Sequence, residues 1–139
     1  MAEFTANTIQ TVAVGQNILF TETPVEGCRS IIHRAGSGLV TLRGNTEQCR
    51  ARFKAFFSGN IAVPTGSDGP ISLAIAIDGE PIATSSVISS PFAVEQYNNV
   101  STAVFIDVPK GCCFSIAVEN SGTVPVNVQN ANLIVERVA

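Results

Sequence analysis

This chain of 139 residues has little of the chemistry that enzymes and metal sites use. It contains no tryptophan and only one histidine, one methionine and one tyrosine. Charged residues make up 14% of it, well below the share of about 25% that is usual in globular proteins. The net charge is −3, so no positive field draws nucleic acid to the chain. A hydrophobic share of 45% excludes disorder, which requires low hydrophobicity and high net charge.

Motifs for catalysis and cofactor binding are also missing. A nucleophile needs a base beside it, and His33 is the one imidazole available. Residues 36–38 (GSG) do not form a G-x-S-x-G nucleophile elbow, and the chain has no phosphate loop or dinucleotide fingerprint. No spacing of cysteine and histidine matches a zinc site. We therefore expect a protein that is not an enzyme and that holds no cofactor or metal.

No segment reaches the length that a membrane-spanning helix needs. The longest apolar run covers residues 71–77, whereas a bilayer requires about 20 residues. The N-terminus has neither the basic region nor the apolar region of a signal peptide. We therefore expect synthesis in a cytoplasm and no membrane partner.

The cysteines are Cys28, Cys49 and the adjacent pair Cys112 and Cys113. Neighbouring residues of a strand point to opposite faces, so the adjacent pair is not expected to bond to itself. One interpretation is that all the thiols are reduced and half-buried. The alternatives are a Cys28–Cys49 disulfide, or bonds between subunits that form outside the cell. The sequence does not choose among these pairings.

Apolar residues recur at every second position, which is typical of β-strands. In residues 71–77 (ISLAIAI), for example, isoleucine and leucine alternate with serine and alanine. The Asp-Gly step that follows favours a hairpin, because its turn requires positive φ angles. The expected strands are residues 8–14, 17–22, 28–34, 39–43, 51–63, 71–78, 82–88, 94–108, 113–119, 124–128 and 131–138. Short strands with evenly spaced turns indicate an all-β sandwich or barrel, here in a single domain.

The C-terminal part of the sequence carries a family resemblance. Residues 101–111 (STAVFIDVPKG) and 114–137 (FSIAVENSGTVPVNVQNANLIVER) resemble the C-terminal half of bacterial C1q/TNF-like jelly rolls, such as the heads of collagen-like spore-surface proteins. Residues 57–66 (FSGNIAVPTG) and 71–80 (ISLAIAIDGE) match a hairpin of the same group. The resemblance is close over residues 50–139 and loose before them.

The resemblance implies an all-β, ten-stranded antiparallel jelly-roll sandwich that spans residues 1–139, assembles as a homotrimer and has no catalytic residues. No collagen-like Gly-X-Y stalk is present, and free-standing domains of this kind are similar to those encoded in phage and prophage structural regions. We therefore expect a bacteriophage virion component, made in a bacterial cytoplasm without a signal peptide. It would be a capsid decoration (cement) protein or a head-fibre unit, and its partner a capsid or other virion protein. The alternatives are a glycan- or receptor-binding jelly-roll module, and a structural subunit of a spore surface or appendage.

Surplus apolar residues indicate where copies of the chain would meet. Residues 71–77, 104–108 and 131–138 have apolar side chains on both faces, whereas a sandwich covers only one face of each strand. The second face needs another partner, and a subunit interface supplies one. Phe56 and Phe57 are adjacent, so one of them must point away from the core. The candidate interface residues are Phe56, Tyr97, Phe105 and Ile134.

Overall fold

The computed structural model describes residues 1–27, 29–91 and 93–139, which form two six-stranded sheets. The first sheet contains β1 (Ala2–Ala6), β2 (Gln10–Val12), β3 (Glu22–Val25), β6 (Arg50–Ala62), β10 (Asn98–Pro109) and β12 (Val126–Arg137). The second sheet contains β4 (Ile31–His33), β5 (Val40–Arg43), β7 (Ile71–Ile77), β8 (Glu80–Pro81), β9 (Val87–Ser89) and β11 (Cys113–Asn120). A short 3-10 turn, η1 (Ala83–Ser85), precedes β9. Within the described ranges, no helix is long and apolar enough to cross a membrane.

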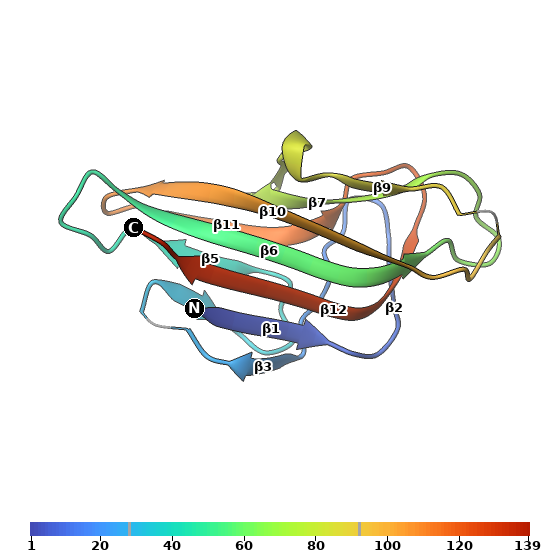
Figure 1. Ribbon diagram of the computed structural model, residues 1–139, viewed down its shortest axis with the longest axis horizontal. Helices are drawn as coiled ribbons and strands as arrows, with labels where there is room; N and C mark the ends of the chain where they lie inside the picture. Colours follow the sequence, from blue (N-terminus) through green and yellow to red (C-terminus); the bar gives the residue numbers. More distant parts are fainter. Residues whose placement is uncertain (28, 92) are drawn as a thin grey trace.

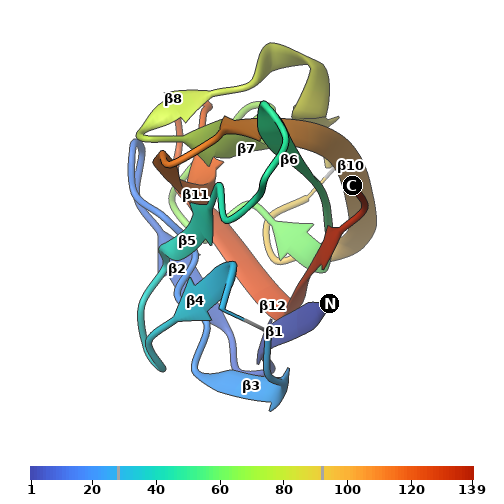
Figure 2. The ribbon, with the colours of Figure 1, turned by 90° about the vertical axis from the view of Figure 1, so that its left-hand side faces the viewer.

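The two sheets pack face to face and enclose the core, as the views in Figures 1 and 2 show. The first sheet has the order β10-β6-β12-β1-β3, and β2 pairs with β12 beside β1. The second has the order β4-β5-β11-β7-β8, and β9 pairs with β7. Strands that are neighbours in space are mostly distant in sequence, and every described strand pair is antiparallel. The all-β sandwich that the alternation predicts is therefore confirmed.

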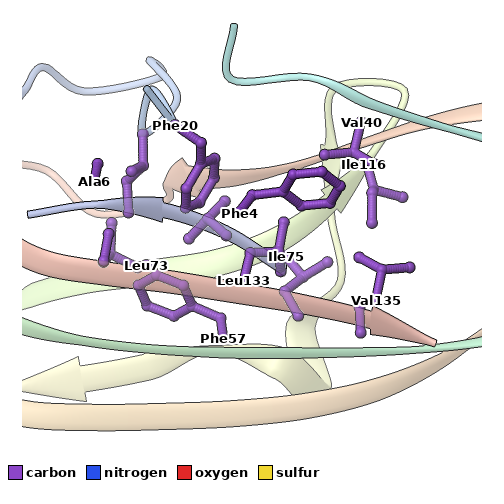
Figure 3. Packing of buried hydrophobic residues seen from close by; sticks show 14 of the residues in the cluster. Phe4, Ala6, Phe20, Val40, Phe57, Leu73, Ile75, Ile116, Leu133 and Val135 are labelled. Atoms are coloured by element: carbon purple, nitrogen blue, oxygen red, sulfur yellow. The ribbon is translucent and has the colours of Figure 1, made fainter. Parts of the chain in front are cut away.

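The alternation of side chains decides which face of each strand is buried. In β6, Phe53, Ala55 and Phe57 are fully buried, whereas Phe56 points to the outer face and is half-buried. Phe57 lies opposite Leu133 of β12, and both side chains point into the core that the second sheet closes (Figure 3). Of the two adjacent phenylalanines, Phe57 is thus the core residue and Phe56 the one that faces away.

Several strands differ from those expected from the sequence. Of residues 17–22 only Glu22 lies in a strand, β3, and residues 82–88 contain η1 before β9 begins at Val87. Residues 124–128 and 131–138 were expected to be separate strands, but residues from both belong to β12, whose register with β6 shifts between Gln129 and Asn132. Asn130 lies in this bulge with φ 56°, a left-handed conformation that asparagine tolerates. The strand expected at residues 8–14 is shortened to β2, and a strand that was not expected, β1, precedes it. Strand β1 forms because β12 offers a partner to every residue from Ala2 to Ala6.

The hairpin predicted at the Asp-Gly step is confirmed. Asp78 and Gly79 both have positive φ, 49° and 87°, and Ile77 pairs with Glu80. Both chain termini lie at one end of the sandwich, since β1 and β12 are antiparallel neighbours (Figure 1). The loop from β5 to β6 and the turn from β10 to β11 lie at the same end (Figure 1).

Candidate assembly surface

The outer face of the first sheet, opposite the core, carries most of the predicted interface residues. Phe56 of β6 lies opposite Ala103 of β10 on one side and Ile134 of β12 on the other. Phe105 lies opposite Lys54, which is the next outward residue of β6, so Phe105 is a diagonal neighbour of Phe56. Phe105 is 63% exposed, and Phe56 and Ile134 are half-buried. The structure thus brings Phe56, Phe105 and Ile134 together in one patch, here called the apolar patch.

Tyr97 lies apart from the apolar patch. It precedes β10, and its neighbour Asn98 pairs with Ile61 near the end of β6. At a rise of about 3.4 Å per residue, Tyr97 and Phe105 are about 27 Å apart along the chain. The Tyr97 hydroxyl is buried, with no hydrogen-bond partner among the described residues. Tyr97 was predicted to share an interface with Phe105, but the structure does not bring the two residues together.

Next to the apolar patch, the same face is rich in amides. The Asn99 amide nitrogen donates to Asn60 Oδ1, and the Asn60 amide nitrogen donates to Asn130 Oδ1, each at 3.2 Å. This chain of hydrogen bonds crosses β10, β6 and β12. The three side chains come from positions 30 or more residues apart, so no local sequence pattern predicts this network.

Two buried polar atoms on this face lack partners within the described residues. They are Thr5 Oγ1 and Asn132 Oδ1, which belong to residues directly opposite each other on β1 and β12. The Asn132 amide nitrogen is satisfied, because it donates to Glu3 Oε2 at 2.8 Å. Buried polar atoms are normally hydrogen-bonded. Both atoms are already covered by the chain's own atoms, so a second surface laid on this face would reach them only after these side chains shift.

An ion-pair cluster borders the apolar patch. Arg52 donates to both carboxylate oxygens of Asp107, at 2.8 and 3.1 Å, and Arg50 Nε lies 3.3 Å from the same carboxylate. Hydrogen bonding from Arg52, reinforced by the charges of both arginines, holds the pKa of Asp107 below its ordinary value. The same pair raises the pKa of Arg52. Asp107 therefore stays ionised at neutral pH and fixes the arginine side chains beside Phe105.

A separate cleft of about 560 Å³ opens between the edge strands β3 and β4. Its lining includes His33, whose ring lies 4.6 Å from that of Phe4. His33 Nε2 donates to the Ser37 carbonyl at 2.9 Å, and Nδ1 lies 3.3 Å from the Thr23 hydroxyl. Because both ring nitrogens are engaged, His33 joins β3 and β4 and is not a free base for catalysis.

The structure also places three of the four cysteines. Cys49, Cys112 and Cys113 are exposed and carry free thiols. Cys28 lies outside the described residues, so the candidate Cys28–Cys49 disulfide stays a prediction. In residues 1–27, 29–91 and 93–139, no group of three or more histidine, cysteine, aspartate or glutamate side chains is placed to hold a metal ion.

Comparison with known proteins gives no match to a family model or to a curated protein sequence. Solved structures do match. Eiger, a TNF from S. frugiperda, superposes with a TM-score of 0.71 and 12% identity. The match covers 99% of this chain and 91% of the Eiger chain. The globular domain of zebrafish complement 1qA superposes with a TM-score of 0.60 and 13% identity. This match covers 96% of this chain and 94% of the complement domain. Neither likeness indicates an enzyme family. The predicted fold class is confirmed: this chain is an all-β jelly roll of the TNF/C1q type.

Proposed function

We propose that this chain is a non-enzymatic structural protein that assembles as a homotrimer through the outer face of the first sheet. The observation that carries the proposal is Phe105, an aromatic side chain that is 63% exposed beside Phe56 and Ile134. Soluble monomers rarely leave contiguous apolar patches of this kind open, and buried aromatics anchor most stable interfaces.

A trimer is favoured over other assemblies by two findings. The chain has the jelly-roll fold of TNF and C1q domains. The resemblance to bacterial C1q/TNF-like jelly rolls, which implies a homotrimer, lies in residues 101–111 and 114–137. These residues include most of β10 and β12, the strands that carry Phe105 and Ile134. In a closed ring, the exposed edge strand β10 of one copy would lie on the face of the next copy.

We further propose that the trimer is a virion component of a bacteriophage, as a capsid decoration protein or a head-fibre unit. Its similarity to phage-encoded jelly rolls supports this location, and a three-fold symmetric unit matches the three-fold positions of an icosahedral shell. The low content of catalytic and metal-binding residues agrees with an architectural role. Its partner in this role would be a capsid or other virion protein.

Immunogold labelling with an antibody against the purified chain tests the location. Labelling of phage particles, with unlabelled spores and cell surfaces, is the expected result. Labelling of spores or appendages would contradict the virion proposal and favour the spore-surface alternative. A glycan array hit that is lost when residues of the cleft between β3 and β4 are changed would favour the binding-module alternative.

A further inference from the structure

One end of the sandwich gathers exposed thiols that the assembly surface does not use. The Lys110 amide donates to the Cys49 carbonyl at 3.0 Å, and the Gly44 amide donates to the Cys112 carbonyl at 2.8 Å. These bonds hold the loop before β6 against the turn before β11, at the left end in Figure 1. As a result, the free thiols of Cys49, Cys112 and Cys113 are all exposed at the same end.

Cys113 differs from the other two because it belongs to a strand. It is the first residue of β11, and Ile116 and Val118 of that strand point into the core. Strand alternation therefore turns Cys113 to the outer face of the second sheet. Its cross-strand neighbour there is Arg43 of β5, also exposed. Among the described cysteines, Cys113 is the one that lies in a strand of this sheet.

The outer face of the second sheet is on the opposite side of the sandwich from the apolar patch. Copies that associate through the first sheet therefore leave Cys113 accessible on the outside of the assembly. A bond through Cys113 would consequently join one assembly to another, and would not close the ring itself. In this respect the inference rests on the proposed function.

The charges beside Cys113 suit a second copy of the same surface. Arg43 flanks Cys113 on the β5 side. On the β7 side lies Asp78, an exposed residue whose carboxylate accepts from the Ser115 amide at 2.9 Å. Two such faces related by a two-fold axis along the strands would set Arg43 of each copy against Asp78 of the other. A contact of this kind is self-complementary in charge and brings the two Cys113 thiols together at its centre.

We propose that this thiol-bearing end is a covalent coupling surface, at which Cys113 of two copies forms a disulfide. With glutathione disulfide as oxidant, the Cys113 thiolate attacks one sulfur and one glutathione thiolate leaves. Cys113 of the second copy then attacks the mixed disulfide and expels the second glutathione. The two protein thiols lose two electrons and two protons, and the oxidant becomes two molecules of glutathione.

Oxidation of the whole chain with glutathione disulfide tests the proposal. On gels run without reductant we expect a species of twice the chain mass of 14.5 kDa. After alkylation of free thiols, peptide mapping should identify a Cys113–Cys113 bond. Cys113→Ser should abolish the covalent dimer, and the matched variants Cys49→Ser and Cys112→Ser should retain it. Recovery of Cys113 as an alkylated free thiol, or in a bond within one chain, would overturn the proposal.

The charge argument has its own test. Arg43→Asp should slow formation of the covalent dimer, because it places like charges against each other, and the exchange of both charges in Arg43→Asp with Asp78→Arg should restore the rate. Equal rates for all three proteins would rule out the two-fold contact.

Sedimentation under reductant separates the coupling proposal from the assembly proposal. A reduced trimer with an unreactive Cys113 contradicts only the coupling, whereas a reduced monomer that still couples contradicts only the trimer.

Discussion

Replacement of Phe105 by alanine is the sharpest perturbation of the proposed interface. A phenylalanine side chain presents roughly 200 Å² of surface. Phe105 is 63% exposed in the single copy, so about 130 Å² is left for a partner to cover at about 25 cal/mol per Å². Full coverage would therefore contribute about 3 kcal/mol for each copy. This value is an upper limit, because alanine retains the Cβ atom.

A ring of three copies multiplies the effect. Loss of about 9 kcal/mol over three copies changes the dissociation constant by about six powers of ten, at 1.4 kcal/mol for each factor of ten. Because concentration enters a monomer–trimer equilibrium as its square, the concentration of half-dissociation should rise about 1,000-fold. Sedimentation equilibrium over a dilution series measures this shift directly.

The matched control for this prediction is Ile88→Ala. Ile88 is 69% exposed, similar to Phe105, but it lies on β9 of the second sheet. We expect no change in half-dissociation for this variant. The dissociated Phe105→Ala chain should still unfold in one cooperative thermal transition, since that substitution removes surface that is already mostly in water, but at a lower temperature than the wild-type trimer, which association stabilises. Equal association of the wild-type chain and the Phe105→Ala chain, with both folded, would refute the assignment of the interface to this patch.

Three further predictions concern the fold that carries the surface. Asn120→Ala should lower the free energy of unfolding by about 2–3 kcal/mol in urea titrations, because the buried side chain makes three hydrogen bonds to backbone groups of β2 and of the loop before β12; a loss below the error of the titration would contradict this role. Gly44→Ala should lower the melting temperature, because a Cβ there would overlap the Pro109 carbonyl oxygen, and an unchanged melting temperature would show that the close approach is not required. Because hydrogen bonding from Arg52 depresses the pKa of Asp107 in the folded state, the contribution of Asp107 to stability is present at neutral pH and is lost as the pH falls through that lowered pKa. Asp107→Asn should therefore lower the urea midpoint at pH 7 more than in strong acid, and an equal or opposite difference would contradict the ion pair.

Most of the fold could be predicted from the alternation of apolar residues in the sequence. Alternation predicted the sandwich and the fact that one of Phe56 and Phe57 faces outward, and the Asp-Gly step predicted the hairpin at Asp78 and Gly79. Each of these features depends on residues close together in the chain. The outward position of Ile134 was also predictable, because Ile134 lies in a run that is apolar on both faces. This run belongs to β12, the middle strand of the first sheet.

Features that depend on distant pairing escaped prediction. The strand Ala2–Ala6 forms because β12, at the other end of the chain, pairs with it. The amide network of Asn60, Asn99 and Asn130 needs three strands in register and a bulge, none of which is visible in a local pattern. Tyr97 was predicted to share an interface with Phe105, but eight residues separate them along the chain and they do not meet.

The mass of the wild-type chain in solution tests the central claim most directly. Sedimentation equilibrium at micromolar concentration, under reductant so that no thiol contributes, should give a species of three times 14.5 kDa. A folded species of 14.5 kDa that persists across the same concentrations would show that the outer face of the first sheet needs no second copy, and would contradict the account.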